Sequence, residues 1–237
     1  MHHKKVDCPK SIYTHRSNCN NTNCNVQCTK LNTCKEAKYL GFTIDSKWAY
    51  KNHIENLIKR LRQMMPSLYR LKGILNTKIK RNLYFAWVES ILRYGIEIYG
   101  QATESQLDRV QKTQNKIIKI LFKEKDNAST EEIFTKNNIL KIRQLRNSVI
   151  IYNNYFSPNF KQVSQHKSER FRPSTYKYNV PFAPNEYGKR IRNVVIPNLF
   201  NKLPNKMFNI NSISRLKKEL KLYLLDTQRG DGGWEWI

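Results

Sequence analysis

The most constraining feature of this 237-residue chain is a series of apolar side chains that recur every three or four residues between positions 54 and 121. Such a period places the apolar groups on one face of a helix, so each run predicts an amphipathic α-helix. The first run covers 47–76 and contains Pro66, where we expect a kink or the start of a new helix. A second helix is predicted over 77–100, and a third follows the capping box of Thr103 and Gln106.

The rest of the chain adds shorter elements to this helical series. Ser129 and Glu132 form a second capping box, and the apolar period returns over 139–156. Six of the eight prolines lie between 158 and 204, which disfavours long helices there, whereas 211–226 again predicts an amphipathic helix. Residues 38–44 predict a short strand. We therefore expect a mainly α fold: a helical bundle, a short β segment on its N-terminal side, and an irregular, Pro-containing C-terminal region that ends in a helix.

The chain is strongly basic, with 43 Lys and Arg against 18 Asp and Glu and a formal net charge of +25. The charge collects in two blocks, with +10 within 51–123 and +9 within 161–237. A polyanion is the natural partner of such blocks, and nucleic acid is the commonest polyanion. An AT-rich genome, which enriches Lys and Asn, is the alternative explanation of the composition.

The sharpest charge pattern lies on the third predicted helix. Its cations repeat at spacings of three and four, about 200° around the helix from the apolar seam of 107, 110, 114, 117 and 121. These cations are Arg109, Lys112, Lys116, Lys119 and Lys123. Like charges at this spacing repel, so the row costs stability unless an anion faces it; the alternative is a merely solvated face. Weaker candidates for nucleic-acid contact are Lys59, Arg62 and Arg70 on the first helix and Lys189, Arg190 and Arg192 near the C-terminus.

Neither a metal site nor an active site is predicted. All five cysteines, at positions 8, 19, 24, 28 and 34, lie within residues 1–37. Their spacing fits no standard zinc pattern, so free thiols are favoured over a zinc knuckle of Cys19, Cys24, Cys28 and Cys34. No two of the six aspartates are adjacent, whereas two-metal phosphoryl transfer needs clustered carboxylates. No apolar run approaches the length of a membrane span and the first residues lack a signal-peptide pattern, so we expect an intracellular protein, nuclear or cytoplasmic.

Four motifs follow one another in the interval 38–226. They are Lys38-Tyr39-Leu40-Gly41-Phe42-Thr43-Ile44-Asp45 with Trp48 and His53-Ile54; Arg93-Tyr94-Gly95-Ile96-Glu97-Ile98-Tyr99-Gly100; Val110-Gln111-Lys112-Thr113-Gln114-Asn115-Lys116; and the group Tyr187-Gly188-Lys189, Asn201-Lys202-Leu203-Pro204 and Leu216-Lys217-Lys218-Glu219-Leu220. In this order they resemble the C-terminal part of jockey/CR1-type non-LTR retrotransposon reverse transcriptases, the thumb and the region downstream of it. Tyr99 stands where that family usually has Trp.

The resemblance implies a fragment of an RNA-directed DNA polymerase. It assigns 1–37 to a poorly ordered remnant of the palm edge, 38–45 to a primer-grip-like strand and turn, 46–156 to a helical thumb-like domain and 157–237 to a basic C-terminal region. Tyr39, Leu40 and Gly41 would contact the primer end, and the helices would hold the template–primer without sequence preference. The palm aspartates of the family, which use Mg²⁺, lie upstream of the residues present, so we expect no cofactor and no polymerisation by this chain. A decayed or domesticated host-encoded helical interaction protein without nucleic-acid function is the alternative.

Overall fold

Helices make up most of the chain, as the apolar periodicity predicts. The computed structural model describes residues 12–14, 29–31, 34–122, 129–156 and 178–229. Its elements are, in order, β1 (Ile12–Thr14), β2 (Thr29–Leu31), β3 (Glu36–Tyr39), β4 (Phe42–Asp45), α1 (Lys51–Leu71), α2 (Thr77–Leu83), the π-helix η1 (Tyr84–Glu89), α3 (Ser90–Arg93), α4 (Ile96–Tyr99), α5 (Glu104–Phe122), α6 (Thr130–Lys136), α7 (Ile142–Tyr155), α9 (Glu186–Arg190), α10 (Arg192–Asn201), the 3-10 helix η2 (Asn205–Asn209) and α11 (Ile213–Arg229). The mainly α fold class is thereby confirmed.

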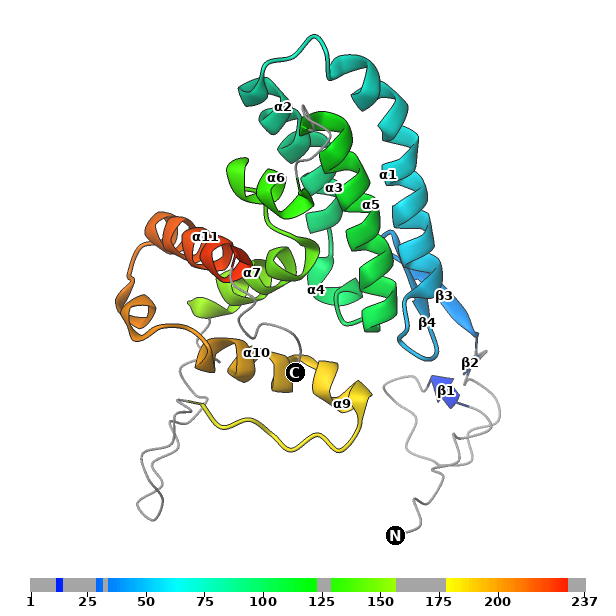
Figure 1. The fold of residues 1–237 in the computed structure, drawn as a ribbon. Helices are drawn as coiled ribbons and strands as arrows, with labels where there is room; N and C mark the ends of the chain where they lie inside the picture. The colour runs from blue at the N-terminus through cyan, green and yellow to red at the C-terminus, as the bar shows by residue number, and fades with distance from the viewer. Residues whose placement is uncertain (1–11, 15–28, 32–33, 123–128, 157–177, 230–237) are drawn as a thin grey trace.

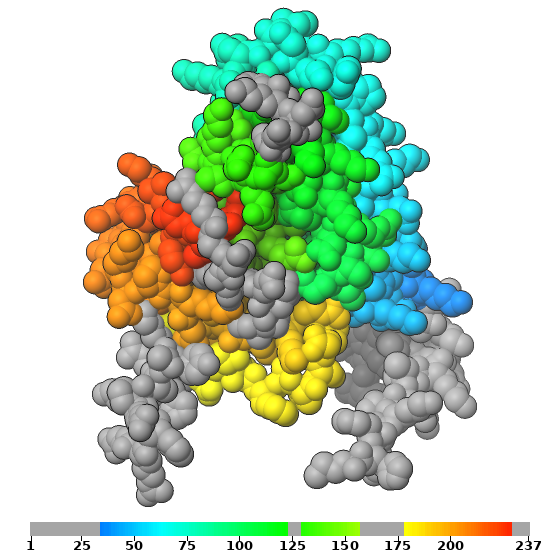
Figure 2. Space-filling model, in the orientation of Figure 1, coloured from blue at the N-terminus to red at the C-terminus, as the bar shows by residue number. Residues whose placement is uncertain are grey.

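The helices form one body with two flanks. α1 and α5 pack side by side along one flank, while α10 and α11 pack against α7 on the other (Figure 1). The space-filling view shows the same division, with the C-terminal helices on the left and α1 along the right edge (Figure 2). A single hydrophobic core joins the flanks, because Leu61 of α1, Ile117 of α5, Leu145 of α7, Phe200 of α10 and Leu224 of α11 are all buried in it. The C-terminal helices therefore complete the core of the earlier ones.

The predicted second helix, 77–100, is wrong as a single element. It begins as α2, widens into the π-helix η1, continues as α3 and stops at Tyr94, whose backbone is extended. Gly95 then adopts a left-handed conformation with φ 63°, and α4 starts in a new direction. Glycine has no side chain and adopts this φ without steric strain, so the chain can turn here. Pro66, by contrast, lies inside the continuous helix α1 and starts no second helix.

The predicted strand over 38–44 is a hairpin. β3 and β4 pair antiparallel, with Tyr39 opposite Phe42, and Leu40-Gly41 form the two-residue turn. Both turn residues have positive φ, 46° and 80°, the combination that a type I′ hairpin turn requires. Within residues 1–37, β1 and β2 also pair antiparallel. Poor order was predicted for this segment, and most of its other residues lie outside the described ranges.

Two further predictions are confirmed, the cap of α6 at Ser129 and a terminal amphipathic helix near 211–226. The Ser129 hydroxyl accepts a hydrogen bond of 3.1 Å from the Glu132 amide and so caps α6. α6 then ends before Asn137-Asn138, where Asn138 is left-handed. The terminal helix predicted over 211–226 is α11, shifted toward the C-terminus by two or three residues.

Glutamine side chains hold the connection between α6 and α7. The Gln114 amide nitrogen donates to the Leu140 carbonyl at 2.9 Å and to the Tyr84 hydroxyl at 2.8 Å, and Gln111 accepts from the Ile142 amide at 2.9 Å. Gln228 of α11 accepts from the Lys141 amide at 3.0 Å. Buried backbone groups need such partners, so the two glutamines of the third motif have a structural role.

Replacing Gln114 by Leu is expected to lower the free energy of unfolding by about 2 kcal/mol, because it leaves the buried Leu140 carbonyl without that donor. Urea denaturation of the variant measures this loss. The matched control is Gln63→Leu on the exposed side of α1, where we expect a change within about 0.5 kcal/mol. Equal stability of the two variants would contradict this role of Gln114.

Candidate nucleic-acid interface

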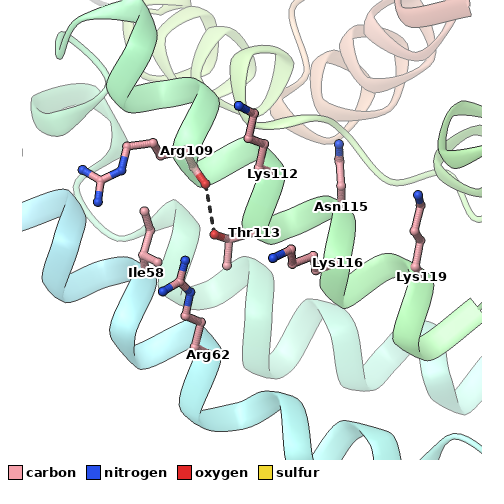
Figure 3. Close-up of a pocket in the computed structure, with 8 residues that line it drawn as sticks. All are labelled: Ile58, Arg62, Arg109, Lys112, Thr113, Asn115, Lys116 and Lys119. Atoms are coloured by element: carbon pink, nitrogen blue, oxygen red, sulfur yellow. Dashed lines mark hydrogen bonds between the residues drawn. The ribbon is translucent and has the colours of Figure 1, made fainter.

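A basic groove runs between α1 and α5. It has a volume of about 370 Å³ and is lined by Ile58, Arg62, Arg109, Lys112, Thr113, Asn115, Lys116 and Lys119. Five of these residues are cations, and we call them the groove cations: Arg62, Arg109, Lys112, Lys116 and Lys119. Figure 3 shows Arg62 of α1 and Lys116 of α5 extending into the same space between the two helices.

The apolar seam of α5 determines where these cations lie. Leu107, Val110, Ile117 and Leu121 are buried, as is the polar Gln114. Lys112, Lys116 and Lys119, on the other side of the helix, are exposed, as the sequence pattern predicts. On α1 the buried Ile58 and Leu61 pack toward the core, and this leaves Arg62 exposed at the edge of the groove. The periodic packing of two helices thus places cations from both along one furrow.

The groove cations are poorly neutralised by the protein. Within the described ranges Arg62, Lys112, Lys116 and Lys119 form no ion pair with a carboxylate. Arg109 donates to the Gln106 side chain at 2.9 Å and lies 3.9 Å from the exposed Glu55 carboxylate. Arg143 of α7, by contrast, pairs with two carboxylates of α5, Glu104 at 2.9 Å and Asp108 at 2.6 Å. Arg143 is thus neutralised within the protein, whereas Arg62, Lys112, Lys116 and Lys119 remain available to an external anion.

The remaining predicted cations divide among other places. Lys59 and Arg70 are exposed on α1 but do not line the groove, and Lys123 lies outside the described residues. The sequence pattern grouped Arg62 with its own helix and gave no sign that it shares a groove with α5. Thr113 and Asn115 also line the groove and were not predicted; their place between the lysines of α5 was the available signal.

The predicted C-terminal cations Lys189, Arg190 and Arg192 lie outside the basic groove and bind other residues of the protein. Lys189 pairs with Glu186 at 2.7 Å, and Arg190 donates to the Gln101 carbonyl at 3.0 Å. Arg192 donates to the Asn154 side chain at 2.6 Å. Arg190 and Arg192 line a second pocket that shares no residue with the basic groove.

The tip of the hairpin formed by β3 and β4 is exposed, and Tyr94 holds it in place. Tyr39 and Leu40 are 66% and 69% exposed. The Tyr94 hydroxyl donates to the Leu40 carbonyl at 2.9 Å, and its ring stacks on Phe42 with centroids 5.2 Å apart. The first and second motifs therefore meet in space through Phe42 and Tyr94. Tyr94, which supports the tip, was not among the predicted site residues.

Asp45, at the end of the hairpin, anchors the start of α1. Its carboxylate accepts hydrogen bonds from the amides of Lys47 and Ala49, each at 3.0 Å, and from Tyr50 at 2.6 Å. Burial opposes ionisation, but the bonds from Ala49, Tyr50 and Lys47 outweigh it and lower the pKa of Asp45. The ionised carboxylate thus couples the hairpin to the first helix.

Asp45→Ala is expected to cost about 1–2 kcal/mol of stability at neutral pH, since charged acceptors make the stronger hydrogen bonds. A pKa that is lower in the folded state contributes stability above the unfolded value, and this stability is lost as the pH falls through the folded pKa. The difference between the parent and the variant should therefore be constant above about pH 5 and shrink below about pH 4. Urea denaturation across this pH range tests it, and a pH-independent difference would contradict it.

Among the described residues no three His, Cys, Asp or Glu side chains are placed to share a metal ion. Cys34 is an exposed free thiol, whereas Cys19, Cys24 and Cys28 lie outside the described residues, so the zinc hypothesis stays a prediction.

None of the helices within the described ranges has the length and apolar character needed to cross a bilayer.

Three curated proteins of Drosophila melanogaster are similar to part of the chain. The probable RNA-directed DNA polymerase from transposon BS is 33% identical over 94 residues, which cover 38% of this chain and 10% of that protein. The probable RNA-directed DNA polymerase from transposon X-element is 30% identical over 88 residues, 36% of this chain and 10% of that protein. The RNA-directed DNA polymerase from mobile element jockey is 31% identical over 85 residues, 35% of this chain and 9% of that protein.

These similarities cover about a tenth of the length of each relative. No protein-family model matches the chain, and no solved structure is significantly similar to it. The jockey-type resemblance seen in the motifs is nevertheless confirmed, because all three relatives are polymerases of mobile elements and one of them is that of jockey itself. A segment of this chain is therefore related to the RNA-directed DNA polymerases of jockey-type non-LTR retrotransposons.

Proposed function

We propose that the basic groove binds the sugar–phosphate backbone of duplex nucleic acid without sequence preference. The observation that supports this most strongly is the convergence of five cations from two helices on one furrow, four of them without an ion pair within the described part of the chain. Holding these charges together costs free energy that a polyanion offsets. The relation to polymerases that act on nucleic acid supports the same partner.

The length of the groove sets how many phosphates it can contact. Arg109 and Lys119 are ten residues apart on α5, which corresponds to about 15 Å along the helix axis. One strand of a duplex carries a phosphate about every 3.4 Å along its axis, so the groove spans about four of them. Neutralising about four phosphates predicts that log K falls with log salt with a slope of about −4, and that Kd is on the order of 10⁻⁵ M at physiological salt.

Within a polymerase the described helices would serve as a thumb-like region that holds the template–primer. The hairpin tip of Tyr39, Leu40 and Gly41 would contact the primer end, and two features support this role: Tyr39 and Leu40 are exposed, and Tyr94 fixes the turn. The names of the three relatives describe polymerases, and the segment similar to this chain makes up about a tenth of each of them. We propose that the present residues contribute binding only, and that they extend no primer with Mg²⁺ or Mn²⁺.

A salt titration tests the proposed function. Fluorescence anisotropy with labelled RNA duplex, DNA duplex and RNA–DNA hybrid of the same sequence, and with a scrambled sequence, measures affinity and slope together. We expect binding to all duplexes, equal affinity for the scrambled sequence, and a slope of about −4. A slope near zero or an absence of binding would refute the proposal and favour the interaction protein without nucleic-acid function.

A further inference from the structure

A second pocket, separate from the basic groove, gathers three arginines. It lies between α4, α7 and the α9–α10 segment, which meet in the lower part of Figure 1, and it has a volume of about 320 Å³. Arg146 of α7, Arg190 of α9 and Arg192 of α10 line it, together with a single acidic residue, Glu97. The pocket therefore carries an excess of positive charge.

Hydrogen bonds to the protein hold all three guanidinium groups in place. Arg146 Nη1 donates to the Gly100 carbonyl at 3.0 Å, Arg190 Nη1 to the Gln101 carbonyl at 3.0 Å, and Arg192 Nη2 to the Asn154 side chain at 2.6 Å. Arg190 Nη2 and Arg192 Nη1 make no hydrogen bond to a described residue. Two positioned guanidiniums thus retain donors, and a guanidinium fork suits the oxygens of a phosphate.

Carboxylates outside the lining, Glu104 near Arg146 and Glu186 near Arg190, offset part of this charge. Glu97 forms no ion pair within the described ranges. Burial lowers the pKa of Arg146 to about 10; Glu104 opposes this shift and Arg143 adds to it, and Arg146 remains a cation at neutral pH. Arg146 and Arg190 are half-buried and Arg192 is exposed. Charges that converge where part of the water is excluded attract an anion more strongly than charges in open water do.

The rest of the lining combines aliphatic side chains with the polar Gln101 and Asn154. Ile150 of α7 and Ile196 of α10 contribute to it. A volume of about 320 Å³ lies at the small end of the range for small-molecule sites, about 300–1,000 Å³. The arginines fit a phosphate, and the aliphatic side chains offer an apolar surface to the rest of a small ligand.

We infer that this pocket binds a nucleotide phosphate monoester, with the phosphate on Arg190 and Arg192 and the sugar and base against Ile150 and Ile196. The free nucleotide and the 5′-phosphate at the end of a strand carry the same chemistry. The inference rests on a site other than the basic groove and does not depend on the proposed function.

Isothermal titration of the full chain with 5′-AMP, adenosine and inorganic phosphate tests the inference. We expect saturable binding of AMP and binding of adenosine at least about tenfold weaker, since adenosine lacks the charged group. Arg190→Gln and Arg192→Gln should each weaken AMP binding about tenfold, and Arg192→Lys, which keeps the charge but loses the fork, should weaken it less. If AMP and adenosine bind with equal affinity, the inference is wrong whatever the variants show.

Two controls separate this pocket from other cations. Arg215→Gln changes an exposed arginine of α11 outside the pocket, and Lys112→Gln with Lys116→Gln changes the basic groove; AMP binding should survive both. AMP binding that falls as far in these controls as in Arg190→Gln would overturn the inference. Competition with a short 5′-phosphorylated oligonucleotide then identifies the source: displacement of AMP by it, but not by the 5′-hydroxyl form, assigns a strand end, and displacement by neither assigns a free nucleotide.

Discussion

Charge reversal of Lys112, Lys116 and Lys119 to Glu is expected to remove most of the affinity for duplex nucleic acid. These lysines are exposed, line the basic groove and form no ion pair with a described residue. Losing about three phosphate contacts should flatten the salt slope from about −4 to about −1. At about 0.1 M salt each contact is worth nearly tenfold in binding, so the affinity should fall by about 10²–10³-fold. Anisotropy titrations of parent and variant at several salt concentrations measure both quantities.

A matched variant distinguishes the groove from the overall charge of the chain. Lys78→Glu, Lys206→Glu and Lys218→Glu change the net charge by the same amount at exposed lysines outside the groove. This control triple should keep a slope near that of the parent, and far-UV circular dichroism should show unchanged helicity in both triples. If the two triples weaken binding equally, affinity follows net charge and the groove is only a solvated face.

Gly95→Ala is expected to destabilise the fold by about 3 kcal/mol, a large share of the 5–15 kcal/mol typical of a domain. Gly95 has a φ of 63°, and a Cβ there would lie 2.0 Å from the Phe42 ring. That ring cannot easily withdraw, because it stacks on Tyr94 at 5.2 Å and packs against His53 at 5.1 Å. The substitution therefore adds backbone strain to a collision between two motifs. Urea denaturation measures the loss of stability.

The control for this glycine is Gly73→Ala. A Cβ at Gly73 would meet no atom within 4 Å, so its free energy of unfolding should change by less than about 0.5 kcal/mol. Combining Gly95→Ala with Phe42→Ala should cost less than the sum of the two single changes, because removing the ring relieves the collision. Additive costs in this cycle, or a Gly95→Ala protein as stable as Gly73→Ala, would contradict the proposed contact.

Much of the helical architecture follows from local sequence. The apolar period of α5 buries Leu107 and Ile117 and leaves Lys112 and Lys116 exposed, since both outcomes depend only on the angle between successive side chains on one helix. Ser129 caps α6 because the cap and the amide it bonds are three residues apart. The predicted helix over 77–100 failed at Gly95, where a φ of 63° breaks the helix. The apolar period also gave no sign that this glycine leaves room for the ring of Phe42, more than fifty residues earlier.

The sequence by itself determined the mainly α class, the exposed row on α5 and, through motifs in consistent order, the kinship with jockey-type polymerases. Only the tertiary structure decided which cations share a site: Arg62 joins the row on α5, whereas Arg190 and Arg192 meet Arg146 in another pocket. It also decided that Tyr94 supports the hairpin tip. The reason is physical. Periodicity sets the direction of a side chain relative to its own helix, but the partner it meets depends on how distant segments pack into one core.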